Sequence, residues 1–179
     1  MSIISLRHLD HLIHRDPERR ALRALARRRE RLPARRSPDA ALQVVTDLSK
    51  DLTTARYAAL AVTDRHDRTE GFYTAGVDPK IMARLRTPPQ GHGPLGSLRY
   101  DGKPVRFDDV RDHAKAFGFP PSHPEMQRLC GVAIWARGEV RGALYIADRT
   151  DGRPFTDDDE ETLITLAAHA SHVVETEWY

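Results

Sequence analysis

The chain has 179 residues, of which 40% are hydrophobic and 30% are charged, and its net charge is +2 at pH 7. This composition is typical of one globular domain with an extension. No apolar run approaches the roughly 20 residues of a membrane-spanning helix, and the first residues lack the apolar core and cleavage site of a signal peptide. The single cysteine, Cys130, excludes an internal disulfide. We therefore expect a cytoplasmic protein that does not enter a membrane.

The charge is unevenly distributed along the chain. Residues 1–36 hold 11 arginines and 4 acidic residues, a balance of +7, whereas the remaining residues have a balance of −5. This change predicts an Arg-rich helical extension over residues 1–37 and a domain over residues 38–179. Leucines spaced three and four apart predict two short helices in the extension. Asp16, Pro17 and Glu18 have the residue types that begin the second helix.

Three roles remain open for this extension. Its helices can pack on the domain or on a second copy as a homodimer, or residues 1–36 can bind a regulatory protein. Clustered arginines also neutralise phosphates. The segment has no interleaved aromatic residues and no recognised DNA-binding motif, so we do not expect nucleic acid as a partner.

The domain shows an alternation of helical and strand patterns. Its sequence predicts five strands, over residues 56–63, 69–75, 104–107, 131–136 and 140–147. Helices are predicted over residues 38–48, 79–85 and 95–98, the last opened by a glycine-spaced turn at 91–96, and after Thr156, which caps a helix whose first turn is filled by aspartates. Spacings of three and four predict a buried face in the first and the last of these helices: Ala41, Leu42, Val45 and Leu48, and Leu163, Leu166, Ala167, Ala170 and Val174. This order of elements predicts an α+β domain with an antiparallel sheet flanked by helices.

A histidine between prolines stands out in residues 118–126, which read GFPPSHPEM. Proline fixes its own φ and restricts the residue before it, so the segment around His123 is expected to be a stiff, extended loop. Such a loop can hold an imidazole in one direction, as a metal ligand requires. From these residues alone, an ordinary turn histidine and a ligand both remain open.

Several motifs occur together in one order along the chain. They are ARYAAL at 55–60, GFPPSHPEM at 118–126, GV at 131–132, RGEV at 137–140, GALYI at 142–146 and FTDDDE at 155–160. With them, residues 38–177 resemble a GAF domain. More narrowly, they resemble the haem-binding GAF domains of actinobacterial dormancy-sensor histidine kinases of the DevS/DosT type. No segment resembles a kinase, so we expect no phosphotransfer by this chain.

The resemblance implies a haem b site. It assigns His123 as the proximal iron ligand and places Tyr145, 22 residues later, on the distal side. We expect the apolar walls to come from Phe72, Phe119, Met126, Leu129 and Ile134. Each can instead belong to the ordinary core, which is the favoured alternative for Leu129 and Ile134, and Tyr145 can be an ordinary buried strand tyrosine. A neutral imidazole leaves the sixth iron position open for O₂, NO or CO, and a tyrosine hydroxyl can donate a hydrogen bond to the bound gas.

The chain departs from the family pattern at two places. Glu125 stands where the family has a second proline. Residues 129–133 read LCGVA, where the family has Phe-Leu-Gly-Val-Pro, and this change introduces the Cys130 thiol. A carboxylate and a thiol near the expected ligand can each change the chemistry of the site.

These observations leave three functions open. The leading hypothesis is a haem b sensor of a diatomic gas or of redox state. The second is a haem-dependent enzyme for a small nitrogen–oxygen or peroxide substrate, with Tyr145, His92 and Glu125 as candidate acid–base groups. The third is a haem-free GAF domain that binds another small ligand or a protein. The single cysteine argues against reduction of free methionine sulfoxide, a GAF activity that uses several cysteines.

Overall fold

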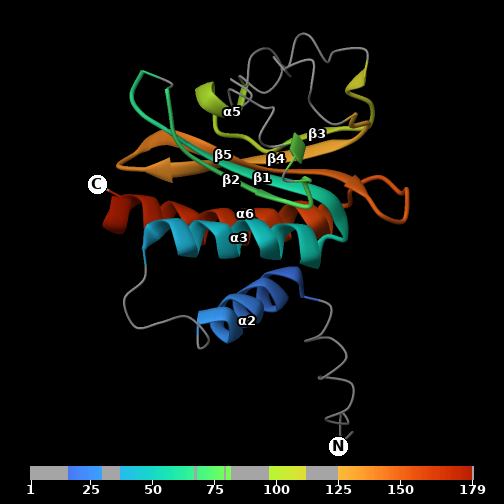
Figure 1. Cartoon of the computed structure of the whole chain (residues 1–179), viewed down its shortest axis with the longest axis horizontal. Helices are drawn as coiled ribbons and strands as arrows, with labels where there is room; N and C mark the ends of the chain where they lie inside the picture. Colours follow the sequence, from blue (N-terminus) through green and yellow to red (C-terminus); the bar gives the residue numbers. More distant parts are fainter. Residues whose placement is uncertain are drawn as a thin grey trace, which may run out of the picture.

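The computed structural model describes residues 16–29, 37–66, 68–78, 80–81, 97–111 and 125–178. Within them, a five-stranded antiparallel sheet has the strand order β2-β1-β5-β4-β3 (Figure 1). The strands are β1 (Ala55–Thr63), β2 (Thr69–Ala75), β3 (Val105–Phe107), β4 (Leu129–Ala136) and β5 (Glu139–Arg149). The predicted α+β class with an antiparallel sheet is confirmed.

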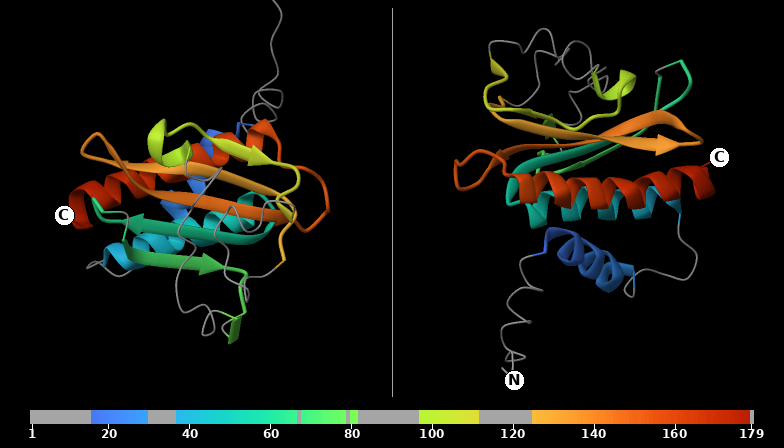
Figure 2. Two further views of the ribbon diagram at one scale, coloured as in Figure 1. Left: turned by 90° about the horizontal axis from the view of Figure 1, so that it is seen from above. Right: turned by 180° about the vertical axis from the view of Figure 1, so that it is seen from behind.

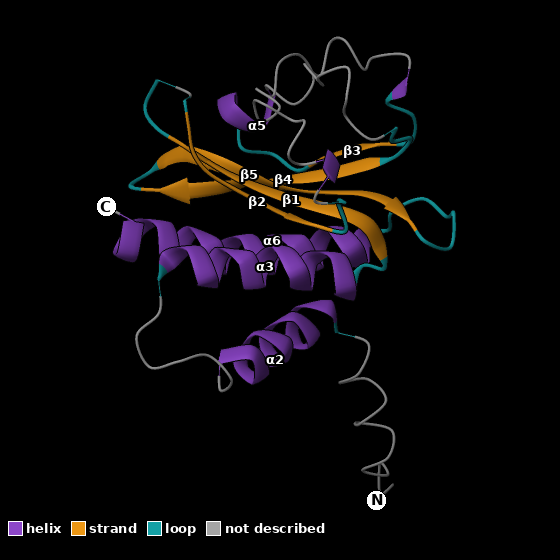
Figure 3. Cartoon of the chain, viewed as in Figure 1, coloured by secondary structure: helices purple, strands orange, loops and turns teal. Residues whose placement is uncertain are grey.

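The helices lie in layers on the two faces of this sheet (Figures 1 and 2). Two long helices, α3 (Pro38–Leu52) and α6 (Asp157–Val173), lie side by side on one face, here called the lower face. The helix α2 (Pro17–Arg29) lies below them, on the side away from the sheet. The short helix α5 (Ser97–Tyr100) lies on the opposite, upper face, and a π-helical turn, η3 (Val174–Trp178), continues α6 (Figure 3).

The helix starts follow the capping residues that the sequence contains. The Asp16 carboxylate accepts a hydrogen bond from the Arg19 N–H at 3.1 Å, and the Ser37 hydroxyl accepts one from the Ala40 N–H at 3.2 Å. The helix α3 continues one turn beyond its predicted end at residue 48. Buried Ser49 permits this because its hydroxyl donates to the Val45 carbonyl at 2.8 Å and leaves no polar group unpaired.

The main hydrophobic core lies between the lower face and the two long helices. The apolar faces predicted for the helices are buried there: Ala41, Leu42, Val45 and Leu48 of α3, and Leu163, Leu166, Ala167, Ala170 and Val174 at α6 and η3. They pack with large strand side chains such as Leu60, Val62 and Ile146. Each fully buried leucine or isoleucine contributes about 1.5–3 kcal/mol relative to its exposed form. This layer therefore supplies most of the stability of the fold.

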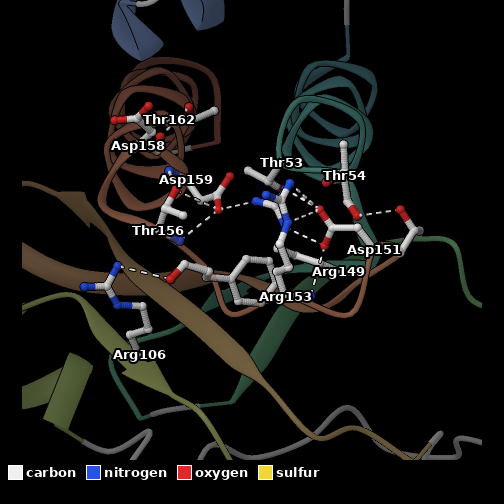
Figure 4. A network of polar contacts seen from close by, with 12 residues as sticks. Thr53, Thr54, Arg106, Arg149, Asp151, Arg153, Thr156, Asp158, Asp159 and Thr162 are labelled. Atoms are coloured by element: carbon white, nitrogen blue, oxygen red, sulfur yellow. Dashed lines mark hydrogen bonds and ion pairs between the residues drawn. The ribbon is translucent and has the colours of Figure 1, made fainter.

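A polar network joins the end of β5 to the start of α6 (Figure 4). Thr156 and Asp159 form a reciprocal capping box at the first turn of α6. The Arg149 guanidinium donates to Asp159 Oδ2 at 2.6 Å and makes two further bonds, of 3.0 and 2.9 Å, to the Asp151 carboxylate. The Arg149 and Asp159 side chains are only 12% and 6% exposed, so solvent screens their ion pair weakly. Arg149, followed by Arg153, lowers the pKa of Asp151 below its usual range.

Some predicted elements lie outside the described residues. These are the first helix of the extension, most of the helix predicted over residues 79–85, and the glycine-spaced turn at residues 91–96. Among the helices that the structure describes, none has the length and apolar content to cross a membrane.

The substitution Asp159→Ala tests the importance of this network. It removes the capping-box carboxylate and one partner of a nearly buried guanidinium, so we expect the free energy of unfolding to fall by about 2–4 kcal/mol. Urea unfolding followed by circular dichroism measures the change. The matched control is Asp158→Ala, an exposed carboxylate in the same turn, for which we expect a loss below about 1 kcal/mol. Equal losses in the two variants would contradict this role for Asp159.

Candidate functional site

Three of the residues predicted to line the site lie together on the upper face. Leu129, at the start of β4, and Val110 are buried in one small cluster. Met126 and Tyr145 are partly buried and pack against that cluster. Tyr145 also packs against a second upper-face cluster, which contains Leu98. The half-buried Tyr145 therefore joins the two apolar clusters on this face.

A glycine provides the space for the Tyr145 ring. Gly131 of β4 is directly opposite Tyr145 in the β4–β5 register. A Cβ atom built at Gly131 would lie 2.6 Å from Tyr145 Cδ1 and 2.9 Å from Cε1, so the ring lies over the glycine. Any side chain at position 131 would push the ring away. Gly131 thus determines where the Tyr145 hydroxyl can lie, a role that the sequence analysis did not identify.

Small residues surround Tyr145 on the same face. Ala59 of β1 is opposite Tyr145, and Ala61 of the same strand is opposite Ala143 of β5, which in turn is opposite Ala133 of β4. Because residues directly opposite one another in an antiparallel pair share a face, these alanines form a low surface beside the ring. The sequence contained a partial signal for it, since residues 59–62 of β1 alternate small and large side chains with a period of two.

Phe72 shares the upper face, on the edge strand β2. It is opposite Ala61 in the β1–β2 register. Its neighbour Tyr73 is on the lower face, where the Tyr73 hydroxyl donates to Asp39 of α3 at 2.6 Å. Burial, followed by that hydrogen bond, raises the pKa of Tyr73. Since successive strand residues alternate between faces, Phe72 lies on the side of Tyr145.

Ile134 does not join the group that the sequence analysis assigned to the wall. Its side chain is fully buried in the lower core with the helices. Gly131 and Ala133 of the same strand lie on the upper face, so strand alternation directs Ile134 to the other side of the sheet. The sheet therefore separates Ile134 from Tyr145.

Cys130 is also on the lower face and is fully buried. Burial is the main cause that raises the pKa of its thiol to about 12, and the charge of Glu160 adds to this. A neutral, buried thiol packs as a small apolar side chain. Glu125 is exposed at the point where the described chain resumes. His92, Phe119 and His123 lie outside the described residues, and their assigned roles remain predictions.

Asp148 fixes the segment that leads into β4. Its carboxylate accepts hydrogen bonds from the Arg128 N–H at 2.8 Å and from the Gln127 N–H at 3.1 and 3.3 Å. The Asp148 N–H donates in return to the Arg128 carbonyl at 3.1 Å. Asp148 follows Tyr145 by three residues, and Gln127 follows Met126 directly. These bonds therefore hold Met126 beside the strand that carries Tyr145.

The hydrogen bonds of Asp148 to Gln127 and Arg128 are here called the Asp148 clamp. Removing the Asp148 carboxylate tests whether they hold this segment in place. Asp148 has a φ of +49°, which Asn tolerates better than Ala does. We expect Asp148→Ala to lower the free energy of unfolding by about 2–3 kcal/mol, because two partly buried backbone N–H groups lose their charged acceptor. We expect Asp148→Asn to lower the free energy of unfolding by less, because its amide oxygen still accepts hydrogen bonds. Hydrogen exchange should accelerate at the Gln127 and Arg128 amides in the Ala variant; unchanged exchange there would refute the clamp.

A separate hollow of about 570 Å³ lies on the other side of the molecule, between α2, the end of α3 and the start of α6. Arg149 and Arg153 line it, together with Asp159 (Figure 4). Both guanidinium groups are paired with Asp151. These two guanidinium groups are thus used within the fold, whereas the upper face carries the residues predicted for a ligand site.

The fold agrees with a comparison against protein families. Residues 35–175 match the family model described as GAF domain. The chain therefore belongs to the GAF domain family, whose fold is used for small-ligand binding and signalling.

Solved GAF structures show the same fold. The GAF domain of the Acinetobacter phosphoenolpyruvate-protein phosphotransferase is 19% identical with a TM-score of 0.67, and the match covers 96% of this chain and 94% of that one. The GAF domain of the same enzyme from Coxiella burnetii is 23% identical with a TM-score of 0.68, covering 86% and 92%. The free methionine-R-sulfoxide reductase of Neisseria meningitidis, solved with its substrate, is 16% identical with a TM-score of 0.64, covering 88% and 90%.

Proposed function

We propose that this GAF domain binds haem b against the upper face of its sheet, with His123 as the proximal ligand. In this proposal it senses a diatomic gas, or the redox state of the iron, through a site that contains Tyr145. One observation supports the proposal most strongly. Tyr145, Leu129 and Met126, which the resemblance to haem-binding GAF domains assigns to one pocket, come from different segments and pack together.

The shape and polarity of the upper face suit a large, flat, apolar group. Ala59 and Ala61 of β1 are half-buried and leave a low surface beside Tyr145, while Leu98 of α5 packs on Ala133 and Ala143. Phe72 on β2 and Leu129 on β4 give this surface apolar margins. His123 precedes Met126 by three residues in the sequence. Met126 is held near Tyr145 by the Asp148 clamp, which supports a ligand and a tyrosine acting at one site.

The proposal gives each side chain a distinct task. Bound haem supplies an iron whose sixth position takes a diatomic ligand. The neutral imidazole of His123 would hold the iron through its lone pair. The Tyr145 hydroxyl donates a hydrogen bond to the bound ligand, and the apolar surroundings strengthen that bond by excluding water. Gly131 sets the height of the tyrosine ring above the sheet.

Absorption spectra test whether the protein binds haem through His123. The protein is produced with haem supplied during expression. We expect a Soret band in the range of roughly 400–430 nm that is lost in His123→Ala. The matched control is His172→Ala, an exposed histidine of α6, which should keep the band. A band that survives in His123→Ala, or a wild-type protein that takes up no haem, would refute the proposal; the second result favours a haem-free GAF domain.

The same preparation separates a sensor from an enzyme. A sensor should form stable complexes with CO, NO or O₂. Tyr145→Phe should release O₂ about tenfold faster, because loss of one hydrogen bond of about 1–1.5 kcal/mol accounts for that factor. Sustained consumption of peroxide or of a nitrogen–oxygen species would instead support a haem-dependent enzyme, for which Tyr145, His92 and Glu125 are the candidate acid–base groups.

A further inference from the structure

The short helix α5 covers part of the upper face (Figure 1). Leu98 of α5 is fully buried and packs with Ala133 of β4 and Ala143 of β5, which are each 7% exposed. Ala59 and Ala61 of β1, on the same face, are half-buried. Within the part of the chain that the structure describes, the surface over β1 is therefore the more open part of this face.

Leu98 and Tyr145 meet above Gly131. A Cβ atom built at Gly131 would lie 3.2 Å from Leu98 Cδ1 and 2.6 Å from Tyr145 Cδ1. Both side chains therefore share the small space above the glycine, and Tyr145 packs against the cluster that contains Leu98. Ala59 is opposite Tyr145 on the side of β1. Leu98 thus limits how far the tyrosine ring can lean toward β4, whereas no large side chain of β1 stands opposite it.

The end of β4 holds α5 in this position. Gly102, two residues after α5, has a φ of +64°, and a Cβ atom built there would overlap the Trp135 indole. The chain after α5 therefore lies directly against this ring. The Trp135 backbone N–H in turn donates to Ser171 Oγ of α6 at 2.9 Å. Contacts thus lead from α6, through Trp135 and Gly102, to the helix that carries Leu98.

We propose that Leu98 is a positioning residue for Tyr145, and that α5, held by Trp135, keeps the Tyr145 hydroxyl directed at the ligand. This inference rests on the proposed function, in which that hydroxyl donates a hydrogen bond to the bound ligand. A close-packed aliphatic neighbour restricts the orientations of an aromatic ring. A smaller side chain at position 98 leaves space into which the ring can lean. The hydrogen bond to the ligand then lengthens and weakens.

A double-mutant cycle on O₂ release tests whether Leu98 acts through Tyr145. We expect Leu98→Ala alone to release O₂ about threefold to tenfold faster, because most of one hydrogen bond is lost. In the Tyr145→Phe background the same change should have less than about a twofold effect. The infrared stretch of bound CO should shift in Leu98→Ala in the same direction as in Tyr145→Phe. Trp135→Ala, which releases α5, should shift it the same way by a smaller amount.

Two matched controls separate positioning from a general loss of stability. Leu42→Ala removes an equally buried leucine from the lower core, and Tyr100→Ala removes a 93% exposed side chain from α5 itself. Both should leave the O₂ release rate and the CO stretch unchanged. If Leu98→Ala does not fold, as circular dichroism reports, Leu98→Val replaces it and should give a smaller effect in the same direction.

The protein without haem supplies a second readout. Nuclear Overhauser contacts should join the Leu98 methyl groups to the Tyr145 ring, and Trp135→Ala should weaken them. Absent contacts, an unchanged O₂ release rate in Leu98→Ala and Leu98→Val, or equal effects of the change with and without the Tyr145 hydroxyl would each overturn the positioning role. A wild-type protein that takes up no haem refutes the proposed function and this inference with it, whereas a haem protein without the coupling refutes this inference alone.

Discussion

The alternation of side chains along a strand is the constraint on which this structure depends. In β4, Cys130, Val132 and Ile134 point to the lower face, whereas Gly131 and Ala133 point to the upper face. The lower set packs against α3 and α6 and supplies the core. The upper set is smaller and leaves the surface around Tyr145 low. One sheet can therefore provide stability on one face and space for a ligand on the other, without a conflict between the two requirements.

The strand β5 connects these two faces to the rest of the domain. Tyr145 belongs to the upper face, Asp148 holds the segment before β4, and Arg149 pairs with Asp159 at the start of α6. These contacts come from five consecutive residues of β5. This one strand therefore couples the geometry of three parts of the molecule: the site, the segment after residue 124 and the last helix. A change at Asp148 or at Arg149 is expected to reach the segment before β4 or the start of α6 through charged hydrogen bonds.

Local patterns in the sequence predicted the elements well, because caps and periodicity act over a few residues. The cap at Thr156 and the buried faces of α3 and α6 are examples. For Ile134 both a wall position and a core position stayed open, because the hydrophobicity of a strand residue does not reveal its face; the structure places it in the lower core. Gly131 and Asp148 were missed because their roles depend on pairing between distant segments: the first on the β4–β5 register, and the second on hydrogen bonds across 20 residues and a positive φ.

A nuclear magnetic resonance titration with haem tests most directly the claim that the ligand binds the upper face. The protein would carry labelled alanine and isoleucine methyl groups, and paramagnetic ferric haem would broaden the signals of methyl groups near it. We expect the signals of Ala59, Ala61, Ala133 and Ala143 to be lost first, while those of Ile134 and Ile146 in the lower core persist. Broadening centred on Ile134 and Ile146, or on the methyl groups of α2 and α6, would contradict the account.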